Sequence, residues 1–196
     1  MRDLLANQAA GGANSNLVGL PDVMVQTGSH LATYFNSEVG RLRIAEPFLR
    51  EGITLGEPCF LIADGRVLER YITALETDGK DELAEARRRG LFETAPAPGK
   101  TVEEALSFWN DRLTLALNGT GHTVVRIVGD MACVKENFGS IEQLLLFERR
   151  VDSILKHYPT VAICQYDVRE FDGQSLLEAI KAHPDVSELG FTKFVS

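Results

Sequence analysis

Apolar residues in this chain occur both as short continuous runs and as longer stretches spaced three or four positions apart. The short runs predict strands at His30–Phe35, Cys59–Ala63, Leu91–Thr94, Thr123–Val128 and Thr160–Cys164, with an edge strand within Leu189–Val195. Stretches with helical spacing lie between most of these runs, and the connections are short. This alternation is typical of an α/β fold with a mainly parallel five- to six-stranded sheet and helices on both faces.

Residues that favour helix ends mark where the expected helices begin and stop. These helices run from a Ser37 cap to a Gly52 stop, from Arg66 to Leu75, from Lys80 to Arg89, from a Thr101 cap to Leu117, from a Ser140 cap to Leu155, and from Ser175 to His183. Pro47 falls inside the first of them and predicts a kink or a late start. Pro184 stops the last one.

The amino-terminal residues lack this organisation. Residues 1–27 are rich in Ala, Gly and Asn, and we expect a flexible arm with a short ordered piece at Val23–Val25. Residues 28–196 carry the strand and helix pattern without internal repeats, and we therefore expect a single domain there.

Composition limits the classes of function. The chain has 196 residues, of which 44% are hydrophobic and 24% charged, as in ordinary globular proteins. A formal net charge of -8 argues against direct binding of nucleic acid. The absence of an apolar run of about 20 residues argues against a membrane partner. Three cysteines far apart in the sequence fit reduced thiols in the cytoplasm, where we expect the protein to act.

Polar side chains gather where two predicted strands end. Tyr34 ends the first strand, and Tyr166 and Asp167 follow the strand that contains Cys164. Ligands of open α/β sheets bind outside the carboxyl ends of the strands, so these groups predict a pocket for a small, partly apolar ligand. In the competing interpretation, the two tyrosines simply cover the core with their hydroxyls in water.

A nucleotide site is a second hypothesis, because the apolar strand before Asp130 resembles a magnesium-organising Walker B strand. Such a site needs a glycine-rich loop with lysine after the first strand. The turn Asn36–Ser37–Glu38 contains neither glycine nor lysine, and Glu38 would repel a phosphate. We therefore expect no ATP hydrolysis, and a role for Asp130 at the strand end is favoured over metal binding.

Metal and thiol chemistry have weaker support. His30, Cys133, Cys164 and Asp167 could in principle form a metal or redox site, but none of them forms the close ligand pair typical of structural zinc sites. Cys164 lies in an apolar strand, where cysteine commonly packs as a small hydrophobe. No predicted helix begins directly at a cysteine. The expectation is a protein without metal or cofactor that is not an enzyme.

Several segments together resemble the MEDS domain, the methanogen/methylotroph, DcmR-type sensory domain. They are His30–Phe35, Pro47–Leu49, Gly52–Glu57, Tyr158–Pro159, Cys164–Asp167 and His183–Pro184, and the resemblance covers roughly residues 28–187. It implies a RecA/KaiC-like three-layer sandwich that has lost its phosphate-binding loop. It also implies the sensing of small molecules, with hydrocarbon derivatives as a proposed class.

The resemblance places His30, Tyr34, Cys164, Tyr166 and Asp167 at motif positions, and with Asp130 they form the predicted ligand-binding set. Ala132–Cys133 stand where the family tends to have an aromatic residue, which predicts an altered pocket.

The function that follows is a stand-alone cytoplasmic sensory domain that binds a small-molecule effector. It would signal through a separate regulatory protein, namely a kinase, an anti-sigma factor or a transcription regulator, and a homodimer is left open. Two alternatives are a degenerate nucleotide-binding module and a pure protein-interaction module without ligand.

Overall fold

A six-stranded parallel sheet forms the centre of the computed structural model, which describes residues 17–20, 23–118, 121–183 and 194–195. In spatial order its strands are β5 (Phe92–Ala95), β4 (Cys59–Ile62), β6 (Val125–Asp130), β7 (Thr160–Asp167), β3 (Ser29–Phe35) and β8 (Phe194–Val195). Neighbouring strands are parallel throughout. The predicted fold class is therefore confirmed. Residues 189–193 of the expected edge strand lie outside the described residues.

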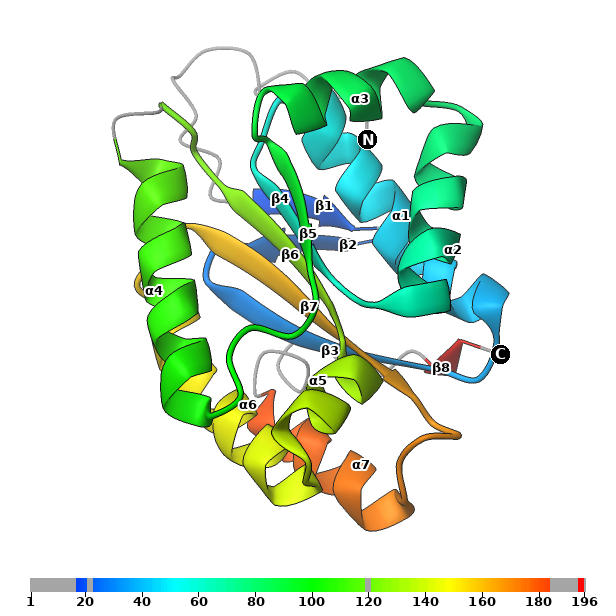
Figure 1. The fold of residues 1–196 in the computed structure, drawn as a ribbon, viewed down its shortest axis with the longest axis vertical. Helices are drawn as coiled ribbons and strands as arrows, with labels where there is room; N and C mark the ends of the chain where they lie inside the picture. Colours follow the sequence, from blue (N-terminus) through cyan, green and yellow to red (C-terminus); the bar gives the residue numbers. More distant parts are fainter. Residues whose placement is uncertain (1–16, 21–22, 119–120, 184–193, 196) are drawn as a thin grey trace, which may run out of the picture.

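Helices cover both faces of this sheet (Figure 1). The first group is α1 (Glu38–Leu55), α2 (Gly65–Thr77) and α3 (Lys80–Arg88), and the second is α4 (Val102–Leu117), α5 (Met131–Phe138), α6 (Ile141–Leu155) and α7 (Gly173–Ala182). In Figure 1, α1, α2 and α3 lie on one side of the sheet, and α4, α6 and α7 lie on the other. The sequence pattern did not predict α5.

Helix α1 does not stop at Gly52, as the sequence pattern predicted, but continues to Leu55 and ends at Gly56 with a φ of 70°. Gly52 has a packing role instead. A Cβ atom on Gly52 would lie 2.6 Å from both Arg126 Cδ and Cys59 Sγ. Glycine therefore lets this helix approach strands β4 and β6 closely. Pro47 lies within the helix.

The prediction of a flexible arm over residues 1–27 is wrong for residues 17–20 and 23–26, which form two strands. Strands β1 (Leu17–Leu20) and β2 (Val23–Gln26) pair antiparallel. Val18, Leu20 and Val25 are buried in the core, so apolar burial holds this pair of strands against the domain. The division of the chain into an arm and a single domain otherwise stays a prediction.

Strand register decides which face of the sheet each side chain occupies. Ala32 pairs with Cys164 and Tyr34 pairs with Tyr166, while Asp130 pairs with Gln165. Side chains alternate between faces along a strand. The residues that the sequence placed at one mouth of the sheet are therefore divided between its two faces.

Candidate functional site

The predicted site residues form two separate groups. Hydrogen bonds to α6 show that Cys164 and Tyr166 face the second group of helices. His30 and Tyr34 share that face by alternation along β3. Asp130 and Asp167 lie on the opposite face, and both form ion pairs with Arg41 of α1.

The protein's own side chains fill the sheet end on the α1 face. Arg41 forms a short hydrogen bond to Asp130 and also lies 3.6 Å from an oxygen of Asp167. Tyr71 of α2 donates to the Gln165 side-chain oxygen, and the Gln165 amide donates to the Arg41 carbonyl at 3.0 Å. These groups occupy the place where the sequence predicted an open pocket.

The two aspartates of this network differ in electrostatics. Burial raises the pKa of Asp130, even though Arg41 and a backbone hydrogen bond from Cys133 oppose the change. Burial would also raise the pKa of Asp167, but two hydrogen bonds from Arg169 outweigh it and lower this pKa. Both groups have internal partners, which indicates a structural role.

On the other face, four side chains that can bind metal ions meet in the interior. His30, Glu148, Cys164 and His183 are all buried, and their ligand atoms lie within 4.8 Å of one another. His30 Nε2 lies 3.0 Å from Glu148 Oε2 and 3.3 Å from Cys164 Sγ. His183 Nε2 lies 3.2 Å from the same Glu148 oxygen. We call these four residues the His–Cys cluster.

A second layer of polar groups orients the His–Cys cluster. The Tyr166 hydroxyl donates to Glu148 Oε1 at 2.9 Å, and His183 Nδ1 lies 2.7 Å from the Ala179 carbonyl oxygen. His30 Nδ1 faces the Asp152 carboxylate at 3.6 Å. Because these contacts hold one polar atom of Glu148, His183 and His30, the other polar atom of each side chain is directed toward the centre of the His–Cys cluster.

Charge interactions inside the cluster outweigh the effect of burial. Burial favours neutral groups, yet the pKa of His30 is raised well above its usual value by Cys164, Asp152 and Glu148. Burial would likewise raise the pKa of Glu148, but His183 and His30 lower it. The cluster therefore favours a carboxylate anion beside positive charge.

The two predicted tyrosines are interior residues and do not face an open mouth. The rings of Tyr34 and Tyr166 stack with centroids 5.5 Å apart, and both residues are buried. Burial and the negative charge of Glu148 raise the pKa of both hydroxyls. The interpretation that left these hydroxyls in water is wrong for both residues.

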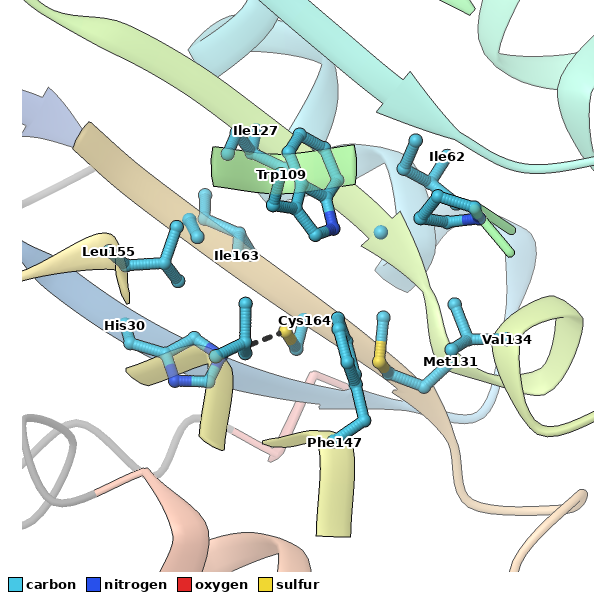
Figure 2. Close-up of a pocket in the computed structure, with 14 residues that line it drawn as sticks. His30, Ile62, Trp109, Ile127, Met131, Val134, Phe147, Leu155, Ile163 and Cys164 are labelled. Carbon is cyan, nitrogen blue, oxygen red and sulfur yellow. Dashed lines mark hydrogen bonds between the residues drawn. The ribbon is translucent and has the colours of Figure 1, made fainter. Parts of the chain in front are cut away.

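An apolar cavity of about 30 Å³ borders the His–Cys cluster. His30 and Cys164 form part of its wall, together with Trp109 of α4, Met131 of α5, Phe147 of α6 and other apolar side chains. Figure 2 shows Trp109 on one side of this space, with Phe147 and Met131 across from it. A space whose exposed lining is apolar suits a small, mainly apolar molecule.

The remaining cysteines take no part in this site. Cys133 lies in the first turn of α5, a helix that the sequence pattern did not predict and that begins at Met131. Burial nevertheless raises the pKa of Cys133 to about 12. Burial also raises the pKa of Cys59, at the other end of the sheet, to about 12. Neither thiol is activated as a nucleophile.

Sequence reasoning missed Glu148, His183 and the cavity. Glu148 is a carboxylate inside the apolar stripe of its helix, between Leu144 and Val151, and a charge there signals a buried partner. His183 lies one turn after buried Ala179 and directly before Pro184. The sequence contains both signals, but it does not indicate which residues Glu148 and His183 contact in the fold.

Side chains of the protein itself make contacts at the start of α1. The Ser37 side chain caps the helix by accepting a hydrogen bond from Gly40 N at 3.1 Å. Glu38 follows in the first turn and pairs with Arg70.

Among the helices that the structure describes, none combines the length and the apolar character needed to span a membrane.

Comparisons with known proteins agree with this arrangement. A family model described as the methanogen/methylotroph, DcmR sensory domain (MEDS) matches residues 29–184. The transcriptional repressor DcmR of Methylorubrum extorquens is 29% identical over 157 residues, which cover 80% of this chain and 58% of the repressor. The chain thus spans little more than half the length of this curated relative.

A KaiC-like protein from Pyrococcus horikoshii is similar in structure, with a TM-score of 0.54 and 15% sequence identity. The match covers 78% of this chain and 68% of that protein. At this identity the likeness shows the fold alone, which is RecA/KaiC-like.

Proposed function

Because the chain belongs to the MEDS family of sensory domains, we propose that it binds a small apolar effector in the cavity beside His30 and Cys164. Membership of this family confirms the resemblance found in the sequence and supports a sensory, regulatory role. The observation that carries the proposal is the cavity itself, whose exposed lining is apolar and which lies beside His30 and Cys164. The ligand-binding assignments of His30 and Cys164 continue as part of this proposal.

The size of the cavity limits the effector. An engineered cavity of about 150 Å³ holds benzene, so a space of about 30 Å³ suits a molecule of one to three non-hydrogen atoms. Met131 is a flexible side chain in the wall and can adapt to a somewhat larger one. Short-chain halides, alcohols and aldehydes fit both this size and the proposed class of hydrocarbon derivatives.

Affinity should be modest for such a small ligand. The best small ligands gain about 1.5 kcal/mol per non-hydrogen atom, so three such atoms give at most about 4.5 kcal/mol. This corresponds to a dissociation constant of about 0.5 mM. A binding assay must therefore reach tens of millimolar of ligand.

The cavity also offers a route for a signal. Its walls come from the sheet through His30 and Cys164, from α4 through Trp109, and from α6 through Phe147. A ligand shifts a conformational equilibrium only if it binds one state more tightly. We infer that the effector favours one packing of α4 and α6 against the sheet.

The test is a titration with one- to three-carbon halides, alcohols and aldehydes, followed by the fluorescence of Trp109, the single tryptophan. Val151→Leu adds a methylene at the cavity wall and should weaken binding at least tenfold. Val39→Leu makes the same change at an exposed position and should leave binding unchanged. Equal affinities in both variants, or no response to any compound, would remove the proposed site.

We propose the signalling partner of this domain from its similarity to DcmR. The relative DcmR is a transcriptional repressor, which supports a regulatory partner for this domain. We infer signalling to a kinase, an anti-sigma factor or a transcription regulator. The three cysteines are free thiols, which fits a cytoplasmic site of action.

The two alternative functions have less support. The capped start of α1, with Glu38 in its first turn, disfavours a phosphate group there, and we infer that the protein is not an ATPase. A pure interaction module without ligand predicts that the protein's own side chains fill the ends of the strands. They do so around Arg41, on the α1 face of the sheet, but a cavity remains on the opposite face.

A further inference from the structure

We propose that His30, Glu148, Cys164 and His183 bind one zinc ion in the interior of the domain. Two imidazoles, a thiol and a carboxylate are the ligand types of protein zinc sites. All four side chains are buried, and their ligand atoms converge within 4.8 Å. This inference concerns the His–Cys cluster alone and does not depend on effector binding in the neighbouring cavity.

Four of the six distances between these ligand atoms are close to those of tetrahedral coordination. Zinc lies about 2.0–2.2 Å from nitrogen and oxygen and about 2.3 Å from sulfur, which places the ligands of a tetrahedron about 3.3–3.6 Å apart. The Glu148 oxygen lies 3.0 Å from His30 Nε2, 3.2 Å from His183 Nε2 and 3.6 Å from Cys164 Sγ. His30 Nε2 and Cys164 Sγ are 3.3 Å apart. The two remaining distances, from the His183 ligand atom to those of His30 and Cys164, are within 4.8 Å, so a movement of His183 by up to about 1 Å would complete the tetrahedron.

The outer partners of the cluster match the second layer of known metal sites. Metal-binding histidines commonly direct their other nitrogen to a carbonyl or carboxylate. His183 Nδ1 lies 2.7 Å from a backbone carbonyl, and His30 Nδ1 faces Asp152 at 3.6 Å. The second oxygen of Glu148 accepts the Tyr166 hydroxyl at 2.9 Å. These contacts orient both imidazoles and the carboxylate before an ion arrives.

Hydrogen-bond accounting places a positive charge, carried by a proton or a metal ion, between His183 and Glu148. The carbonyl of Ala179 can only accept, so His183 Nδ1 carries a proton and donates it. In neutral His183 the lone pair of Nε2 then points at Glu148 Oε2, which is also an acceptor. A proton on Nε2 meets this need when His183 is positively charged, and a zinc ion would meet it when that proton is released.

The mixture of ligands selects the class of metal. Calcium and magnesium prefer oxygen ligands alone, whereas imidazole and thiolate together suit zinc. With four protein ligands available, the ion would complete a closed, structural type of site. Binding would release the Cys164 thiol proton and any proton held on the Nε2 atoms of the two imidazoles.

The first test measures metal in the whole protein as purified from zinc-supplemented cells. We expect about one zinc per chain by elemental mass spectrometry, and its loss after treatment with a chelator. The stripped protein is then titrated with Co²⁺, which reports tetrahedral thiolate coordination through visible ligand-field bands and a sulfur-to-metal charge-transfer band.

Variants locate the ion. Cys164→Ala should abolish the charge-transfer band, and His183→Gln should weaken Co²⁺ binding at least tenfold. Cys133→Ala removes a buried thiol outside the cluster and should keep both band and affinity. Circular dichroism of each variant confirms that it is folded before its spectrum is compared.

Tyr166→Phe tests the orienting layer and should weaken binding by about 10- to 100-fold while retaining the charge-transfer band. The proposal is wrong if the wild-type protein retains no zinc and gives no thiolate band with Co²⁺. It is also wrong if folded Cys164→Ala shows the same band as the wild type. Neither result would bear on effector binding, because the cavity titration is read separately.

Discussion

Replacing Tyr166 with phenylalanine should cost far more stability than the loss of one hydroxyl at the surface. The hydroxyl donates to Glu148 Oε1 at 2.9 Å, and both residues are fully buried. The phenylalanine ring would keep the stacking on Tyr34, whose centroid lies 5.5 Å away. The change therefore isolates the hydrogen bond to the carboxylate.

The magnitude follows from the charge of the acceptor. Hydrogen bonds to charged groups contribute about 1.5–3 kcal/mol, and bulk water does not reach this one because both residues are fully buried. For a domain of this size, 1 kcal/mol corresponds to about 2–4 °C in melting temperature. We expect Tyr166→Phe to melt about 3–12 °C below the wild type.

Tyr158→Phe is the matched control. Its hydroxyl lies 2.9 Å from both the Thr114 hydroxyl and the Asn110 side-chain oxygen, close to the surface, where water can take its place. We expect a cost below about 1 kcal/mol. Denaturant unfolding followed by Trp109 fluorescence, with a chelator present throughout, compares the two variants. A cost for Tyr166→Phe no larger than that for Tyr158→Phe would refute the reasoning about the buried carboxylate.

Three further outcomes are expected. Gly52→Ala should destabilise by about 1–3 kcal/mol in urea unfolding, because its Cβ would lie 2.6 Å from Arg126 Cδ; unchanged stability would contradict this packing role. Arg41→Met should cost about 3–5 kcal/mol in the same assay, because Asp130 loses its buried counter-charge; a cost near zero would show that this pair is dispensable. Cys133, whose pKa burial raises to about 12, should resist iodoacetamide at neutral pH until the protein is unfolded; rapid labelling of the folded protein would contradict that burial.

The sheet and its helices could be predicted because each element carries its own local signal. The short, mainly apolar run from His30 to Phe35 and the cap at Thr101 are read from neighbouring residues alone. Strand order is a different kind of information. Nothing local indicates that β3 pairs with β7, which places His30 beside Cys164 although 134 residues separate them. Long-range pairing is decided by the packing of the whole domain.

The candidate site shows the same limit. Side chains alternate between the two faces of the sheet along β7, so Cys164 and Tyr166 lie on one face and Asp167 lies on the other. The sequence alone therefore indicates that these three residues do not line one pocket. Glu148 in an apolar stripe was a readable signal for a buried polar contact. The cavity could not be predicted from the sequence, because its volume is the space that remains between Trp109, Met131 and Phe147 after they have packed.

Methyl NMR tests the proposed effector site most directly. The chain has three methionines; Met131 lies in the cavity wall, and Met24 is exposed on the β1–β2 pair of strands. Protein labelled with ¹³C at the methionine methyl groups is titrated with xenon and then with the small halides and alcohols. We expect the Met131 signal to shift in a saturable manner while the Met24 signal stays in place. A Met131 signal that does not move, or one that moves no more than the Met24 signal, would contradict effector binding in this cavity.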